Sequence, residues 1–272
     1  MTAITSRTMD GYVSSRRKEP GKKRGDLVSP ATVNKEIRHL KAVLGFAQEW
    51  GYLPQRPKMR MVKEPVKLPA YVTPDDFATI YRAADAARMP RGLPCAAADW
   101  WRALFVFNYM TGWRISEPLS IRRDDLDLDE GFTITRHDDN KGNRDDRVPL
   151  TEVVVDHLRK IASFEPVIFP WPHHERSLWS EYARIQRAAG IHLPCRENHE
   201  HTSSCHVYGF HDLRRAFATL NAETISAVEL QGLMRHKSFQ ATQRYINMAR
   251  HLTRAVENLY VPDVLRATGG GF

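Results

Sequence analysis

The clearest helical pattern in the chain lies in residues 29–51. Apolar residues recur there every three or four positions, at Val33, Ile37, Leu40, Leu44 and Ala47. This spacing lines one face of an α-helix. Ser29 and Pro30 are favoured as the N-cap and the first helical residue, and Gly51 is typical of a helix end. The pattern predicts an amphipathic helix with a basic outer face.

The segment that follows this helix has no convincing periodicity. Prolines interrupt it at positions 54, 57, 65, 69 and 74. A proline-rich stretch between two patterned regions is typical of an interdomain linker. We therefore predict two domains with a boundary near residue 68. Residues 1–68 would form a short helical domain with its linker, and residues 69–272 a larger domain.

Two helices are expected at the start of the larger domain. Thr73 is a suitable N-cap, and Asp75 and Asp76 follow in the first turn, where the helix dipole favours acidic side chains. Residues 96–112 are almost wholly apolar. A helix that is apolar on every face is a buried one, so this segment should be the central helix of the domain.

Residues 125–150 change to short alternating runs broken by Asp, Asn and Gly, which predicts a small antiparallel sheet with hairpin turns. Helical patterns return afterwards, at about 151–162, 176–189, 211–221, 224–235 and 239–258. The predicted fold is mostly α with one small antiparallel sheet, an α+β architecture.

Composition narrows the class of protein. The chain has 272 residues and is 42% hydrophobic, which suits globular domains. It shows no apolar run of about 18 residues and no secretory signal, so a cytoplasmic protein without a membrane partner is expected. Its three cysteines are too few and too unevenly spaced for a disulfide framework.

The net charge of +8 is concentrated at the N-terminus. Residues 1–60 hold 13 Lys and Arg against 5 Asp and Glu, which leaves 27 against 27 for the rest. Such a patch attracts polyanions through counterion release, so nucleic acid is the leading partner and an acidic membrane surface the second. The candidate DNA-binding residues are Arg16, Arg17, Lys22, Lys23, Arg24, Lys35, Arg38 and Lys41.

Three motifs carry candidate chemistry: "TGWRISE" at 111–117, "HDLRRAFAT" at 211–219 and "LMRHKSFQATQRY" at 233–245. In this order they resemble the boxes of the tyrosine recombinase, or phage integrase, family over roughly residues 70–260. A lysine that the family places in the turn between the second and third strands matches Lys141. The resemblance implies a DNA-breaking and rejoining enzyme whose basic N-terminal helices clamp DNA.

The same residues make chemical sense without the family name. Breaking a phosphodiester without a metal needs a nucleophile, cations for the charge that grows on the phosphate, and proton transfer at both oxygens. The planar guanidinium groups of Arg114 and Arg214 suit the phosphate. A tyrosine hydroxyl needs a base or cationic surroundings before it attacks, and Tyr245 is the expected nucleophile.

The remaining motif residues are assigned to proton transfer and hydrogen bonding. His211 is the candidate base, His236 a hydrogen-bond donor to the phosphate, and Lys141 the acid that protonates the leaving 5′ oxygen. Glu117 is expected to orient Arg114. The product would be a 3′-phosphotyrosyl bond that a second 5′ hydroxyl reseals, with no ATP and no catalytic cofactor.

Two features depart from the family pattern. Arg235 stands where many members carry glycine before the histidine, and it is expected either to add a DNA contact or to strain the turn. The N-terminal region carries one clear helix and a weaker candidate, against about four in the family. A DNA-binding remnant of an integrase, impaired in catalysis, and a type IB topoisomerase-like nicking and closing enzyme are therefore alternatives to a recombinase from a mobile genetic element.

The C-terminal segment contains the amphipathic stretch "ARHLTRAVENLY", which could dock on a neighbouring protomer or pack on its own domain. Docking would suit the homo-tetramer on paired sites of double-stranded DNA that the resemblance implies.

A cluster of cysteines and histidines precedes the second motif. Five of the chain's Cys and His residues fall between positions 195 and 206. Together they suit a structural Zn²⁺ ion, although the spacing differs from two separated pairs, and reduced thiols in a polar loop are the alternative. The candidate ligands are Cys195, His199, His201 and Cys205, with His206 in reserve.

Overall fold

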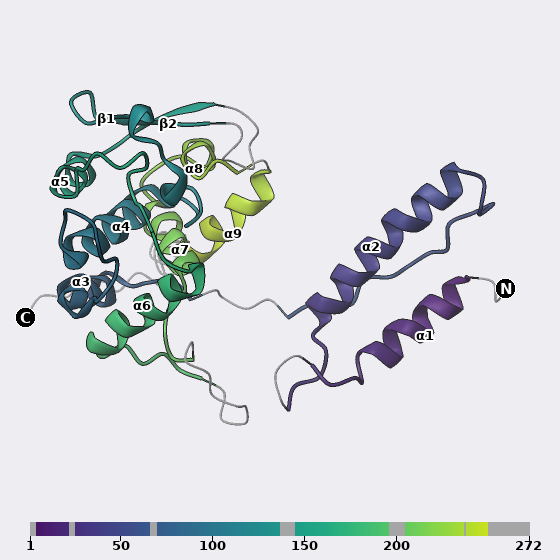
Figure 1. Ribbon diagram of the computed structural model, residues 1–272. Coiled ribbons are helices and arrows are strands. Elements are labelled where there is room, and N and C mark those ends of the chain that lie inside the picture. The colour runs from purple at the N-terminus through teal and green to yellow at the C-terminus, as the bar shows by residue number, and fades with distance from the viewer. Residues whose placement is uncertain are drawn as a thin grey trace, which may run out of the picture. The chain divides into compact units, whose positions relative to one another are not determined.

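A computed structural model describes residues 4–21, 25–65, 70–136, 145–195, 205–236 and 238–249. Contacts between residues divide the chain into two compact units (Figure 1). The first comprises Met1–Lys67 and Pro194–Cys205, and the second Leu68–Leu193 and His206–Phe272. Each unit contains a hydrophobic cluster of its own.

The first unit contains helices α1 (Ser6–Arg16) and α2 (Pro30–Glu49). The predicted start of α2 is confirmed, because the backbone N–H of Thr32 donates to Ser29 Oγ at 3.2 Å. The predicted apolar face is also confirmed in this helix. The buried residues of the hydrophobic cluster in the first unit are Val28, Val33, Ile37, Leu44 and Met59.

A buried amide holds the chain that leaves α2 back against the helix. Asn34 is 2% exposed; its Nδ2 donates to the Val62 carbonyl at 2.9 Å, and the Val62 N–H donates to its Oδ1 at 2.8 Å. Residues 52–65 form no helix or strand. The proline-rich segment is therefore extended and fixed by side-chain hydrogen bonds.

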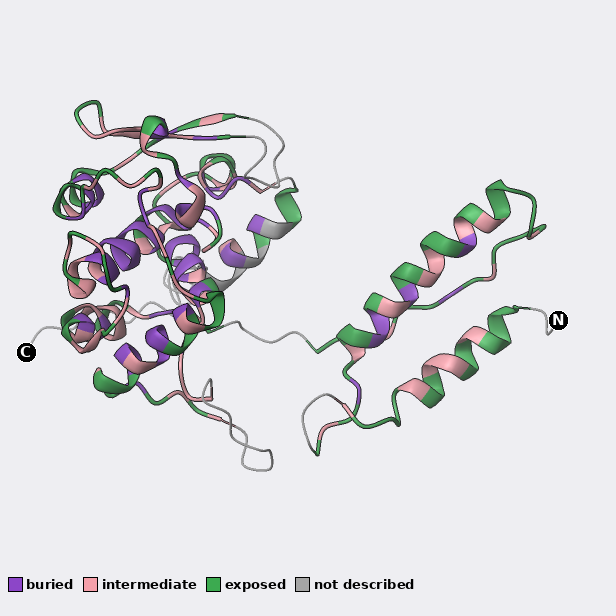
Figure 2. Cartoon of the chain, in the orientation of Figure 1, coloured by how far each residue is buried: buried purple, intermediate pink, exposed green. Residues whose placement is uncertain are grey.

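The second unit is built around α4 (Ala97–Thr111), which packs against α5 (Glu152–Lys160) and α7 (Phe210–Asn221). Figure 2 shows α4 as largely buried, as its apolar sequence predicts. Before it come α3 (Pro74–Arg82), capped by Thr73 as predicted, and a 3₁₀ turn, Ala83–Ala86.

A three-stranded antiparallel sheet follows α4, in the predicted region. It consists of β1 (Leu126–Asp127), β2 (Phe132–Thr135) and β3 (Asp146–Pro149), in the order β1-β2-β3. Thr133 pairs with Val148 in the register of the last two strands. Two 3₁₀ turns lead into this sheet from α4, Pro118–Ser120 and Arg123–Asp125.

Helices complete the described part of the second unit, and they confirm the mostly α architecture. Besides α5 and α7 they are α6 (Glu175–Ala188), α8 (Ala227–Leu233) and α9 (Phe239–Ala249). The prediction of a helix over 224–235 was too long, since the hydroxyl of Ser226 accepts from the Glu229 N–H at 3.2 Å and caps α8 there. No helix among the described residues is long and apolar enough to cross a membrane.

Helix α7 has two buried faces. One contributes Phe210, Leu213 and Ala216 to the large core around α4. The other joins a separate small cluster with α8 and α9. The buried members of this second cluster are Phe217, Ala218, Leu230, Met234 and Tyr245.

Candidate active site

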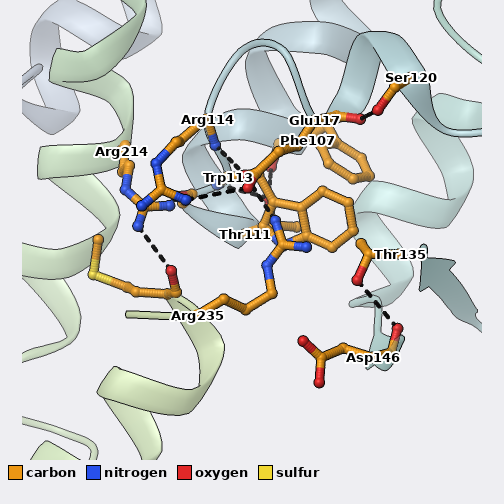
Figure 3. A network of polar contacts seen from close by, with 12 residues as sticks. Phe107, Thr111, Trp113, Arg114, Glu117, Ser120, Thr135, Asp146, Arg214 and Arg235 are labelled. Carbon is orange, nitrogen blue, oxygen red and sulfur yellow. Dashed lines mark hydrogen bonds and ion pairs between the residues drawn. The ribbon is translucent and has the colours of Figure 1, made fainter. Parts of the chain in front are cut away.

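Arg214 joins the three sequence motifs. Its side chain comes from α7 and is 1% exposed. One guanidinium nitrogen, Nη1, donates to the Gly112 carbonyl at 2.5 Å, and Nη2 donates to the Met234 carbonyl at 2.7 Å (Figure 3). A guanidinium has five N–H donors, so these two bonds leave others for a phosphate.

Gly112 allows the first motif to lie close to α7. It ends α4 in the left-handed region, with φ of +65°, and its N–H donates to the Asn108 carbonyl at 3.0 Å. A Cβ at this position would lie 2.4 Å from Cδ1 of Phe217. The glycine is therefore required both by its backbone conformation and by the approach of α7.

Glu117 holds Arg114, as the sequence predicts. The Arg114 N–H donates to Glu117 Oε2 at 2.6 Å, and Arg114 Nη1 lies 3.2 Å from Oε1. The Glu117 side chain is 5% exposed, whereas that of Arg114 is 31% exposed. The arginine is thus fixed from the protein side and open to solvent on the other.

His236 and Tyr245 come together across the turn between α8 and α9. Their rings are nearly parallel, at 10°, with centroids 6.1 Å apart. Nδ1 of His236 lies 2.9 Å from Oγ1 of Thr242, within hydrogen-bond distance. Tyr245 is 8% exposed and packs in the cluster of α7, α8 and α9.

The electrostatic environment differs between the arginines and the histidines. Burial, followed by the positive charge of Arg114, lowers the pKa of Arg214 to about 10, so Arg214 stays protonated near neutral pH. Burial, followed by the charges of Arg214 and Arg114, lowers the pKa of His236 to about 4. The pKa of His211 is also lowered, first by desolvation and then by Arg215 and Arg214. Both imidazoles are therefore neutral at pH 7.

The other predicted site residues are placed as follows. His211 lies in the first turn of α7 and is exposed. It lies near enough to His236 to affect its titration. Lys141 falls between the end of β2 and the start of β3 in sequence, and it lies outside the described residues, so its role stays a prediction.

Thr242 is a contact of His236 that the sequence did not predict. It is fully buried, and its hydroxyl faces Nδ1 of His236. A neutral histidine donates from Nε2 only when Nδ1 accepts, which the Thr242 hydroxyl can provide by donating. The spacing of Thr242 and Tyr245, three residues apart on one helix, was the available signal.

We expect Thr242→Val to slow DNA cleavage about 10-fold or more, because the tautomer of His236 loses its partner while the side-chain volume is kept. Single-turnover cleavage of a DNA substrate measures the effect. Thr242→Ser keeps the hydroxyl and is the control, for which a rate near that of the parent is expected. Equal rates for the valine and serine variants would contradict this role.

The candidate DNA-binding residues of the first unit differ in their exposure and in their ion pairs. Arg16 contacts Glu36 through Nε and Nη2, the latter at 2.9 Å, and Glu19 through Nη1 at 2.6 Å. Arg17, Lys35 and Arg38 are exposed. Lys41 is half-buried, whereas Lys22, Lys23 and Arg24 lie outside the described residues. Arg16 is thus already neutralised by two carboxylates.

The predicted zinc ligands fall partly outside the described chain. Cys195 and Cys205 are half-buried, whereas His199 and His201 are not described. Among the described residues no group of three or more His, Cys, Asp and Glu side chains is arranged to hold a metal ion. Zinc binding by this loop stays a prediction. The amphipathic stretch predicted after Tyr245 begins at the last residue of α9, Ala249, and the rest of it lies outside the described residues.

Comparison with known proteins identifies the family of this chain. The model of the phage integrase family matches residues 71–251. The chain therefore belongs to the phage integrase family, and the resemblance of its motifs is confirmed. Its curated relatives are tyrosine recombinases and a putative integrase/recombinase.

Tyrosine recombinase XerA of Pyrococcus furiosus is 24% identical over 239 residues, which cover 83% of this chain and 73% of the relative. The putative integrase/recombinase y4eF of Sinorhizobium fredii is 23% identical and is matched over 89% of its length, covering 93% of this chain.

Solved structures show the same fold. XerH recombinase bound to a palindromic difH substrate, in a post-cleavage complex, superposes with a TM-score of 0.69 at 16% identity, covering 95% of this chain and 73% of that one. The Tn1549 transposon integrase in complex with circular intermediate DNA gives a TM-score of 0.66 at 16% identity, covering 95% and 86%.

Proposed function

We propose that this recombinase breaks and rejoins double-stranded DNA through a 3′-phosphotyrosyl bond on Tyr245. The Tyr245 oxygen attacks the phosphorus, and the bond from phosphorus to the 5′ oxygen breaks. His211 takes the tyrosyl proton, and Lys141 gives a proton to the 5′ oxygen. The bond energy is kept in the ester, so resealing by a 5′ hydroxyl needs no ATP and no metal cofactor.

The observation that supports this proposal best is the pair of carbonyl contacts made by Arg214. These contacts fix the buried guanidinium of Arg214 between the turn that precedes Arg114 and the turn that precedes His236. Two cations and a neutral imidazole thereby share one location, which suits a phosphate whose negative charge grows as the tyrosine attacks. The lowered pKa of His211 suits a base, because a neutral imidazole can accept a proton.

DNA and a tetrameric assembly are proposed from the relatives and the charge of the chain. One structure with the same fold is a lambda integrase tetramer bound to a Holliday junction, with a TM-score of 0.58 at 20% identity over 88% of this chain. The excess of basic residues in the first unit would contribute the nonspecific part of DNA binding. Strand exchange between two paired sites would require four protomers.

Tyr245→Phe is expected to abolish the covalent adduct while DNA affinity stays within about two-fold of the parent, because only the hydroxyl is removed. The substrate is a nicked suicide DNA, taken from a pool of genomic fragments when the site is not known. Denaturing electrophoresis detects the protein attached to DNA, and the fragments that become attached identify the site.

The control is Tyr208→Phe, which removes a hydroxyl bonded to Asp76 outside the site. It should keep the adduct. An adduct that persists in Tyr245→Phe would refute the assigned nucleophile. Salt-sensitive DNA binding with no adduct from the parent chain on any fragment would instead favour the remnant that only binds DNA, and relaxation of supercoils without strand exchange would favour the topoisomerase-like alternative.

A further inference from the structure

Arg235 occupies a backbone conformation that favours glycine. It lies between α8 and His236, with φ of +51°, in the left-handed region that side chains with a Cβ rarely adopt. The strain predicted for this turn is therefore present. A bulky residue in such a position calls for a compensating contact of its side chain.

The side chain of Arg235 points into the protein, so the expected DNA contact is not made in this structure. Arg235 is 9% exposed as a residue. Its guanidinium carbon lies 4.0 Å from the centroid of the Trp113 ring, and Nη2 lies 2.7 Å from Glu117 Oε2 (Figure 3). Trp113 itself is buried and packs edge-on against Phe107 of α4. The residue before His236 thereby contacts the same turn that carries Arg114.

The Glu117 carboxylate is shared between two arginines. Oε1 faces Arg114 Nη1, and Oε2 accepts the Arg114 backbone N–H and also faces Arg235. A carboxylate that is 5% exposed needs compensating positive charge, and two guanidinium groups supply it from two different motifs. Burial lowers the pKa of Arg235, and the charge of Glu117 opposes this effect.

None of the three guanidinium nitrogens of Arg235 makes a hydrogen bond of good geometry among the described residues, and Nη2 contacts Glu117 as an ion pair. The contacts of the group are therefore the carboxylate and the face of the indole, a combination for which a planar guanidinium is better suited than an ammonium. These contacts act on Glu117 and Trp113, not on solvent.

We propose that Arg235 is a positioning residue for the recombination reaction: its guanidinium, held between Glu117 and Trp113, fixes the turn of His236 relative to Arg114. This inference rests on the proposed function, because it assigns Arg235 to the geometry of those two phosphate-binding groups. Arg235 acts through Glu117 and does not touch the DNA.

Arg235→Gly is the decisive variant, because glycine relieves the backbone strain at φ of +51° and removes the guanidinium. We expect the single-turnover cleavage rate to fall about 10-fold or more, since small displacements of positioned groups are costly. The dissociation constant for DNA should stay within about two-fold. If Arg235 had no positioning role, Arg235→Gly would cleave DNA as fast as the parent or faster.

Two further measurements separate positioning from a general effect on folding. In a Glu117→Gln background, Arg235→Gly should cause little additional loss of cleavage, because both changes remove the same contact. Millimolar guanidinium chloride should restore part of the cleavage rate of Arg235→Gly, whereas equal concentrations of urea or sodium chloride should not. If the losses of cleavage rate caused by Glu117→Gln and Arg235→Gly multiply in the double variant, the inference is overturned. It is also overturned if guanidinium chloride restores no activity to Arg235→Gly.

Arg184→Ala is the matched control. Its Nε lies 3.1 Å from the equally buried carboxylate of Glu181, in α6 and outside the site. Its cleavage rate should equal that of the parent. Arg235→Lys keeps a charge at the turn and serves if the glycine variant does not fold; an intermediate rate is expected. Tyr245→Phe, assayed alongside, reports on the proposed nucleophile alone, so each failure can be told from the other.

Discussion

Arg214→Ala should lose both catalysis and stability. Its guanidinium is the donor for the Gly112 and Met234 carbonyls, and each buried carbonyl left without a donor costs about 1–3 kcal/mol. We expect the free energy of unfolding to fall by about 2–4 kcal/mol in urea titrations. The cleavage rate should fall by about 10²–10³-fold, the usual loss when one donor to a developing negative charge is removed.

Arg214→Lys separates the two losses. Lysine keeps a positive charge but cannot place two nitrogens of one rigid plane on the two carbonyls. Arg215→Ala is the control in the same helix, since Nη1 of Arg215 pairs with Asp212 at 2.6 Å and its side chain is 31% exposed. It should change stability by less than about 1 kcal/mol. An Arg214→Ala protein as stable as Arg215→Ala would contradict the structural part of this prediction.

Gly112→Ala should destabilise the second unit by roughly 2–5 kcal/mol. The left-handed conformation costs about 1–2 kcal/mol for a residue with a Cβ, and overpacking against Phe217 adds about 1–3 kcal/mol. The new Cβ would lie 2.4 Å from Phe217 Cδ1, so helix α7 or the motif turn must shift. Cleavage should fall with it, because Arg114 follows two residues later. Chemical denaturation and single-turnover cleavage measure the two effects.

Gly190→Ala is the matched control for the free-energy cost of the left-handed backbone conformation. Gly190 has φ of +73°, and a Cβ there would meet nothing within 4 Å. It should cost only about 1–2 kcal/mol, the cost of the left-handed conformation. The difference between the two variants is the steric cost of Phe217, so Gly112→Ala and Phe217→Ala combined should lose less stability than the sum of the two single losses. Equal losses at the two glycines would show that the close approach of α7 does not matter.

The features of this protein that depend on local chemistry could be predicted from its sequence. Ser29 and Thr73 cap their helices through bonds to residues three positions away, and such spacings can be read directly. The wholly apolar central helix and the hairpin region were predicted for the same reason. The six catalytic candidates came from motif order and residue type, and five of them are described.

The contacts between motifs could not be read from the sequence. The inward direction of Arg235 depends on its contacts with Trp113 and Glu117, which are more than a hundred positions away in the chain. The need for glycine at position 112 depends on Phe217 in another helix. Thr242 was missed because its partner lies across a turn. In each case the determinant is tertiary packing, which no local pattern encodes.

The separation of the two hydrophobic clusters in the second unit has a thermodynamic consequence. Proteins open in cooperative parts whose free energies differ, and the parts follow the packing. Tyr245 belongs to the small cluster of α7, α8 and α9, whereas the turn with Arg114 follows the large core around α4. The nucleophile and the first phosphate-binding arginine therefore stand on parts of the protein that can open with different free energies. Arg214 and Arg235 are two of the side chains that couple them.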